Sequence, residues 1–151
     1  MSCTIRKMTA EDKSCVLDMM RTFYASAAVF TNGSEEIFHR NIDTCIQGNP
    51  YLEGYVMEEA GIVQGYAMIA KSYSTEFGKP CIWIEDLYIA DAYRKQGIGT
   101  CFLLYITNRF PGCLFRLEAE EENAHAIRVY EKCGFTVLPY LEMKFEKRHP
   151  L

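Results

Sequence analysis

Residues 94–100 combine two glycines and two basic side chains, a composition that suits an anion-binding turn. The stretch consists of Arg94, Lys95, Gln96, Gly97, Ile98, Gly99 and Thr100. The first backbone N–H groups of a helix have no intrahelical acceptor and carry partial positive charge, so a helix that begins here would attract a phosphate. The glycines would let the backbone bend sharply and approach a pyrophosphate closely. The basic side chains would add full positive charges beside it.

Two familiar phosphate-binding loops do not fit this stretch. The dinucleotide-binding pattern G-x-G-x-x-G requires a glycine where Phe102 stands. The Walker pattern requires Gly-Lys-Ser/Thr, whereas Ile98 follows Gly97 here. A helix-start turn without a ligand would use the same two glycines, so the identity of the turn depends on the rest of the chain.

A second block of residues occupies positions 123–135. Asn123 is followed there by Ala126, Tyr130 and the pair Gly134-Phe135. Together with Arg94-x-x-Gly97-x-Gly99, this block resembles the two signature motifs of the GNAT superfamily, the acyl-CoA-dependent N-acyltransferases. The two motifs span roughly the C-terminal half of the chain, and the N-terminal half agrees with the family in predicted topology alone.

The resemblance implies a binding mode for acetyl-CoA. The pantetheine arm would lie along the strand residues Leu87, Tyr88 and Ile89 and would bond to backbone groups of the first and last of these. The pyrophosphate would lie on the turn at residues 94–100, and Asn123 would contact the pantetheine arm. Many family members have a proline where Asp91 stands, which changes a rigid turn residue and not a ligand.

The resemblance also implies a general acid at Tyr130, which would bond to the thioester sulfur and protonate the departing thiolate. A phenol suits this task because it is protonated at neutral pH. An ammonium substrate must lose a proton before its nitrogen attacks, and Glu85 is the first candidate base, acting through water, with Asp86 the second. Adjacent strand residues point to opposite faces, so without a bulge only one of these two carboxylates can face the cleft.

Each of these residues also has a structural explanation. Tyr130 could be a core tyrosine, Asn123 a helix N-cap, and Glu85 an ion-pair partner or an anchor for substrate charge. The favoured function is direct transfer of an acetyl group from acetyl-CoA to a primary amine of a small cationic metabolite. Glu85-Asp86 also resembles the family branch that acts on polyamines and diamines. The alternatives are acetylation of a protein N-terminus or lysine, and a non-catalytic acyl-CoA-binding sensor.

Composition describes an ordinary globular protein. A hydrophobic content of 49% is ordinary for a globular protein, and a length of 151 residues predicts a single domain over residues 1–151. The seven cysteines lie at least twelve positions apart and the three histidines are scattered, so no metal site is expected. A net charge of −4 disfavours nucleic acid and anionic membranes as partners. The sequence shows no signal peptide or membrane span, which predicts a cytoplasmic enzyme, and it leaves the oligomeric state open, a homodimer included.

Hydrophobic periodicity and turn residues predict the elements that position these groups. The predicted order β-α-α-β-β-β-α-β-α-β is that of the GNAT α/β fold, a mixed central sheet of about six to seven strands flanked by four helices. Residues 72–79 are expected to be irregular. Trp83, Tyr24, Phe30 and Tyr73 are candidates for lining a substrate pocket. The predicted elements are a strand at 3–8, helices at 10–26 and 34–47, a hairpin at 53–59 and 62–70, a strand at 81–89, a helix from 98 that stops before Pro111, a strand at 113–119, a helix at 123–133 and a strand or hairpin at 135–145.

Overall fold

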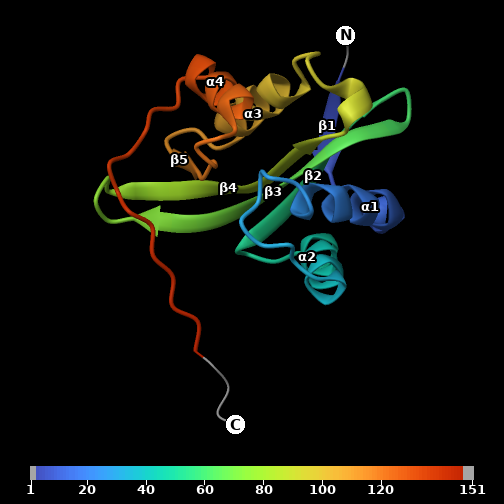
Figure 1. The fold of residues 1–151 in the computed structure, drawn as a ribbon, viewed down its shortest axis with the longest axis horizontal. Helices are drawn as coiled ribbons and strands as arrows, with labels where there is room; N and C mark the ends of the chain where they lie inside the picture. Colours follow the sequence, from blue (N-terminus) through green and yellow to red (C-terminus); the bar gives the residue numbers. More distant parts are fainter. Residues whose placement is uncertain (1–2, 148–151) are drawn as a thin grey trace.

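A computed structural model describes residues 3–147, which form one mixed sheet with a pair of helices on each face (Figure 1). Short 3-10 helices precede α1 and α3, at Ala10–Asp12 and Asp91–Tyr93. The arrangement confirms the predicted α/β fold and the order of its elements up to the last helix. The elements are β1 (Thr4–Lys7), α1 (Lys13–Tyr24), α2 (Glu35–Gln47), β2 (Leu52–Glu59), β3 (Ile62–Ser74), β4 (Lys79–Ile89), α3 (Ile98–Arg109), β5 (Leu114–Leu117) and α4 (Ala124–Lys132).

Local sequence signals set the ends of the helices as predicted. Asp12 accepts a hydrogen bond of 2.7 Å from the backbone N–H of Thr9, the carboxylate half of a capping box. Ser34 caps α2, because its hydroxyl accepts the N–H of Ile37 at 3.2 Å. Gly48 then ends α2 with a φ of +84°, a conformation that favours glycine.

The five strands follow one another in space in the order β1-β2-β3-β4-β5. The first four strands are antiparallel neighbours. The predicted hairpin turn between β2 and β3 is present, and both of its central residues, Ala60 and Gly61, have positive φ. β5 pairs with β4 in parallel over residues 81–84 and 114–117. Within residues 3–147, β5 is therefore the last strand at its end of the sheet.

Alternation along the strands divides the core into two layers. On one face, α1 and α2 pack on β2 and β3, where Val56, Tyr66 and Met68 are buried. On the other face, α3 packs on residues of the opposite parity, such as Tyr55, Ala67 and Ile69, and α4 adds partly buried side chains. The two helix pairs thus lie on opposite sides of β4.

The prediction that residues 72–79 are irregular is wrong. β3 continues to Ser74 and β4 begins at Lys79, and the register pairs Tyr73 with Pro80. A tight turn joins the strands, in which the N–H of Gly78 donates to the carbonyl of Ser74 at 2.8 Å. The side chains are polar because most of this end of the hairpin is exposed, and that polarity hid the strand pattern.

The predicted strand or hairpin at residues 135–145 is also absent. Residues 135–147, called the C-terminal segment below, follow α4 without forming a helix or strand, and Figure 1 shows them leading away from the sheet. The described sheet therefore has five strands instead of six to seven. The alternation that suggested a strand is real, but Pro139 cannot donate to a ladder and the segment has no strand partner in the described chain.

Candidate functional site

A β-bulge in β4 lies at the centre of the candidate site. Ile84 pairs with Ile69 and Asp86 pairs with Met68, so Glu85 is an extra residue without a partner on β3. On the other side of β4, the pairing with β5 ends at Ile84. Residues 85–89 consequently continue past the end of the parallel ladder.

The backbone beyond the bulge has hydrogen-bonding groups available on its outer edge. The N–H of Ala90 donates to the carbonyl of Gln64 on β3 at 2.9 Å. Because successive residues of a strand alternate in the direction of their N–H and C=O groups, Leu87 and Ile89 direct theirs away from β3. The outward groups of Leu87 and Ile89 could pair with the amide groups of an extended ligand, as predicted for these two residues. The backbone groups of Tyr88 point toward β3, so Tyr88 could contact such a ligand only in another way.

The bulge also brings both predicted carboxylates to one cavity. Glu85 and Asp86 line a space of about 330 Å³ on the α1–α2 side of the sheet. The restriction to one carboxylate applied to a regular strand, and the bulge removes it. The other residues of this cavity, called the acceptor cavity below, are Tyr24, Asn41, Tyr51, Leu52, Met68 and Ala70.

Asp86 is fixed in place by two tyrosines. Its side chain is only 4% exposed, and its oxygens accept hydrogen bonds from the phenols of Tyr24 at 2.9 Å and Tyr66 at 2.8 Å. Burial raises the pKa of Asp86, and the two phenol bonds oppose that shift. Burial beside Asp86 also raises the pKa of both phenols, so they remain proton donors. The arrangement makes Asp86 a rigid acceptor at the cavity wall.

Replacing Tyr66 with phenylalanine is expected to lower the free energy of unfolding by about 1–3 kcal/mol, because one oxygen of Asp86 would lose its buried donor. Urea unfolding followed by circular dichroism measures this change. Tyr73→Phe is the matched control on the same strand, since Tyr73 is 63% exposed and should change stability by no more than about 0.5 kcal/mol. Equal stability of the two variants would contradict the role of the Tyr66 phenol.

Glu85 lies among other acidic groups. It is an exposed residue, yet neighbouring atoms desolvate its carboxylate, and this desolvation, with the charges of Asp86 and Glu142, raises its pKa. Glu118, just beyond β5, also has a raised pKa, because it is desolvated and lies close to the carboxylate of Glu142. The site thus has a cluster of negative charge, which suits a positively charged ligand.

The predicted anion-binding turn has an open, unsatisfied helix start. Gly97 is the N-cap of α3 with a φ of +80°, and the first intrahelical bond runs from the N–H of Cys101 to the carbonyl of Gly97 at 2.9 Å. The three intervening N–H groups, of Ile98, Gly99 and Thr100, precede the helical ladder. A Cβ built at Gly97 or Gly99 would meet no atom within 4 Å. A pyrophosphate could therefore approach this backbone closely, and these residues fit the group.

Arg94 connects the turn to the strand end. Its Nε donates to the carbonyl of Ile89 at 2.8 Å, and its guanidinium lies over the ring of Tyr88 and pairs with Asp91. Asp91, which stands where many family members have proline, thus has a partner of its own. Lys95 is exposed and has a φ of +62°. Arg94 and Lys95 thus place positive charge in the turn that precedes α3.

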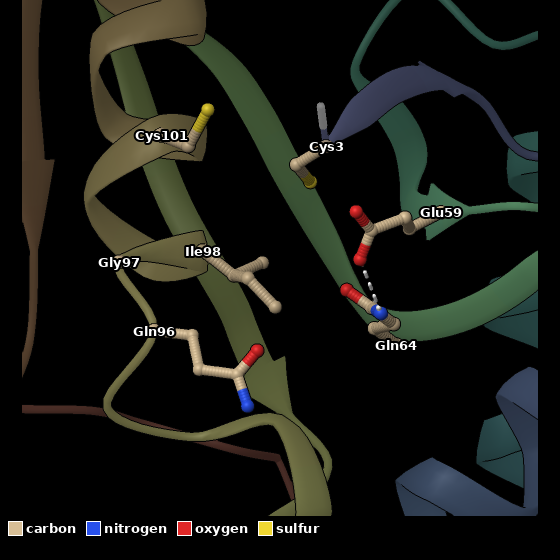
Figure 2. A pocket seen from close by; sticks show the side chains of 7 residues that line it. All are labelled: Cys3, Glu59, Gln64, Gln96, Gly97, Ile98 and Cys101. Carbon is tan, nitrogen blue, oxygen red and sulfur yellow. Dashed lines mark hydrogen bonds between the residues drawn. The ribbon is translucent and has the colours of Figure 1, made fainter. Parts of the chain in front are cut away.

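A second, smaller cavity of about 110 Å³ lies beside the start of α3. Figure 2 shows Gln96 and Ile98 on one side of it and Gln64, which donates to Glu59 at 3.3 Å, on the other. Cys3 and Cys101 also line it. This cavity could not be predicted from the sequence, because its walls come from elements far apart in the chain.

The second motif forms α4 as expected. Asn123 caps the helix, since its side-chain oxygen accepts the N–H of Ala126 at 3.4 Å. Tyr130 is half-buried against Phe135, with ring centroids 6.1 Å apart, and burial raises its pKa. Tyr130 lies with α3 and α4 on the face opposite the acceptor cavity, and it does not line that cavity. The open edge of β4 lies between Tyr130 on one face of the sheet and the acceptor cavity on the other.

The four aromatic candidates have different environments. Tyr24 lines the acceptor cavity, whereas Trp83 stacks on Arg116 at 4.6 Å outside it. Phe30 and Tyr73 are exposed. Asn41 and Tyr51 line the cavity but were not predicted, because single polar and aromatic residues carry no spacing signal. Within residues 3–147, no group of three or more His, Cys, Asp or Glu side chains could hold a metal ion, and no helix is long and apolar enough to span a membrane.

Comparison with known proteins identifies the relatives of this chain. Thialysine N-epsilon-acetyltransferase of Mus musculus is 30% identical over 113 residues, which cover 65% of this chain and 66% of that protein, just under two-thirds of its length. A possible acetyltransferase from Clostridium difficile 630 has the same fold, with a TM-score of 0.83 at 18% identity over 97% of this chain and 99% of that one. An aminoglycoside N-acetyltransferase, AAC(6')-Iy, solved with CoA, matches with a TM-score of 0.76 at 15% identity over 97% and 95% of the two chains.

The profile of the acetyltransferase (GNAT) family matches residues 17–135, most of the chain and both predicted motifs. Enzymes of this family use acetyl-CoA as the acetyl donor. The fold, the two motifs and the family match agree, and the chain belongs to the acetyltransferase (GNAT) family.

Proposed function

We propose that this acetyltransferase moves the acetyl group of acetyl-CoA directly to a primary amine of a small cationic metabolite, within a single domain over residues 1–151. One observation carries the proposal. The bulge in β4 presents Glu85 and Asp86 together to the acceptor cavity, next to the open edge of the same strand. Carboxylates at this position attract an ammonium group and can take its proton.

The acceptor cavity favours a small substrate over a peptide. Helices α1 and α2 form one wall of it, since Tyr24 comes from the end of α1 and Asn41 from α2. At Gly33 the chain passes close to α2, because a Cβ there would lie 2.6 Å from the ring of Phe38. A cavity of about 330 Å³ fits a compact amine. The named substrates of two similar proteins, thialysine and an aminoglycoside, are also small amines.

Acetyl-CoA would bind along the other side of β4. Its pantetheine arm would pair with the backbone of Leu87 and Ile89, and its pyrophosphate would lie on the free N–H groups at the start of α3. Arg94 and Lys95 would supply charge beside the pyrophosphate, and Asn123 would contact the pantetheine arm. Bound there, acetyl-CoA supplies the activated acetyl thioester.

Two side chains on opposite sides of β4 would each carry out one proton transfer. Glu85 would take a proton from the ammonium group through water, because its raised pKa makes it a better base than an ordinary glutamate. Tyr130 would give a proton to the departing thiolate. Attack is direct in this proposal, since no cysteine lines the acceptor cavity and burial raises the pKa of nearby Cys45 to about 12.

Replacing Glu85 with glutamine is expected to lower kcat/KM for the amine by about 100-fold, because the variant has no carboxylate to accept the proton. The pH profile gives a sharper test. In the natural enzyme, kcat/KM should fall as the pH drops through the raised pKa of Glu85, at a higher pH than an ordinary glutamate would require. The variant should lose this acid limb.

The exposed loop residue Glu121 provides the control, since Glu121→Gln removes the same charge without touching the cavity. Initial rates of CoA release across a pH series measure both variants. Retention of the acid limb in Glu85→Gln would show that another group accepts the proton, and Asp86 would then be the next candidate.

A further inference from the structure

Two thiols face each other across the smaller cavity beside the start of α3. Cys3 lies just before β1, and Cys101 lies in the first turn of α3. Both line the cavity of about 110 Å³, and Figure 2 shows them on its opposite walls. Both are free thiols in this structure, and neither has a role in the proposed acetyl transfer.

The sequence spacing around each cysteine explains why the two side chains meet. Cys3 and Ile5 are two positions apart, so they lie on the same face of the sheet, and both pack against the α3 layer of the core. Cys101 follows Ile98 by three positions, so these two side chains share one side of the helix. Ile98 lines the same cavity. The fold therefore brings together two cysteines that lie far apart in the chain.

The two thiols differ in their access to solvent. Cys101 is exposed, so an oxidant in solution can reach its sulfur. Cys3 is half-buried, and desolvation, together with Cys101 and the carboxylate of Glu59, raises the pKa of its thiol. Cys101 contributes to this shift because the two side chains lie close together. The exposure of Cys101 and the protonated state of Cys3 make Cys101 the first of the two to react with an oxidant.

We propose that hydrogen peroxide oxidises Cys3 and Cys101 to a reversible disulfide within one chain. The thiolate of Cys101 attacks one peroxide oxygen and becomes a sulfenic acid, while the O–O bond breaks and the departing hydroxide takes up the proton that the thiol released. The thiolate of Cys3 then attacks the sulfur of the sulfenic acid, so that the S–S bond forms and a second hydroxide leaves and is protonated to water. In total the two thiols lose two electrons and two protons, and the peroxide is reduced to two water molecules.

The surroundings of Cys3 allow this bond to close. The pairing of β1 with β2 begins at Thr4, so the backbone at Cys3 lies outside the ladder and can adjust. The cavity that both side chains line gives the two sulfurs room to come into bonding distance.

The disulfide would anchor one edge of the sheet. β1 is an edge strand that pairs with β2 alone within residues 3–147. The bond would tie this strand to the first turn of α3. Because the bond closes the long loop from position 3 to position 101, it would also restrict the unfolded chain. The oxidised protein is therefore expected to resist heat better than the reduced protein.

Peroxide treatment of the full chain, followed by alkylation of the remaining thiols and peptide mass spectrometry, tests the proposal. We expect a pair of peptides linked through Cys3 and Cys101, and a Tm about 5–15 °C above that of the reduced protein. Dithiothreitol should remove the link and return the Tm to its original value, because this dithiol takes over the disulfide by exchange. Differential scanning calorimetry measures the Tm.

Cys3→Ser and Cys101→Ser should each lose the linked peptides and the rise in Tm. In Cys3→Ser, dimedone should trap a sulfenic acid at Cys101, because no second thiol is there to attack it. Cys113→Ser is the control and should keep both the link and the rise in Tm. Cys113 lies near Cys81, but Cys81 is only 2% exposed, so peroxide does not reach it. Circular dichroism verifies that each variant is folded.

An equal mixture of ¹⁴N- and ¹⁵N-labelled chains shows whether the link forms within one chain, in which case both linked peptides carry the same label. Absence of the Cys3–Cys101 link from the treated natural protein, links that join chains of different label, or an unchanged Tm would each overturn the proposal. None of these measurements involves acetyl-CoA or an amine, so their failure leaves the proposed function untouched.

Discussion

Tyr130→Phe is expected to lower kcat by about 100- to 1000-fold and to leave the affinity for acetyl-CoA nearly unchanged. Phenylalanine keeps the ring that packs on Phe135, so α4 should stay in place. The lost hydroxyl is the proposed proton donor to the departing thiolate, and burial keeps it protonated at neutral pH. Initial rates of CoA release measure kcat, and calorimetric titration measures acetyl-CoA affinity.

Tyr105→Phe is the matched control for this experiment. Tyr105 lies on α3 in the same apolar cluster, half-buried against Tyr55, with no role in the proposed chemistry. Its replacement should leave kcat unchanged. Full turnover by Tyr130→Phe would contradict the general-acid role and would show that Tyr130 has a structural role in the core.

Gly97→Val is expected to weaken acetyl-CoA binding by about 10- to 100-fold. A β-branched residue is strained at a φ of +80°, at a cost of about 1–3 kcal/mol, and relief of that strain would turn the N–H groups of the helix start away from the pyrophosphate. A loss of about 1.4–2.8 kcal/mol in binding corresponds to this range of affinities. Calorimetric titration with acetyl-CoA measures the change.

Gly48→Val separates loss of stability from loss of the binding site. Gly48 has a φ of +84°, it is as free of neighbouring atoms as Gly97, and it ends α2 away from the turn at residues 94–100. Both variants should lose free energy of unfolding, Gly48→Val the more, because its ψ of 126° lies outside the left-handed region in which Gly97 lies, but Gly48→Val should keep its acetyl-CoA affinity. If Gly97→Val binds acetyl-CoA as the natural protein does, the turn does not hold the pyrophosphate.

Local signals made most of the fold predictable. Ser34 and Asn123 mark the starts of α2 and α4 because each side chain caps its own helix, and Ala60-Gly61 marks a hairpin because the turn needs positive φ. These effects act within a few residues. The order of elements followed from them, and with the two motifs it was enough to identify the family.

The features that shape the acceptor cavity could not be predicted in this way. The bulge at Glu85 exists in the register between β3 and β4, which no single strand reveals. Asn41 and Tyr51 reach the cavity only after α2 and the start of β2 have packed together. The C-terminal segment shows the opposite case, because its strand pattern was recognised although the described chain offers it no partner.

Amine-dependent release of CoA from acetyl-CoA is the measurement that tests the proposed function most directly. A panel of polyamines, amino acids including thialysine, aminoglycosides and peptides would be assayed by thiol release, with mass spectrometry of the acetylated product. We expect turnover with at least one small cationic amine and none with the peptides, and we expect Glu85→Gln to slow that turnover. Acetylation of peptides alone, or no acetylated product from an enzyme that binds acetyl-CoA, would contradict the proposal.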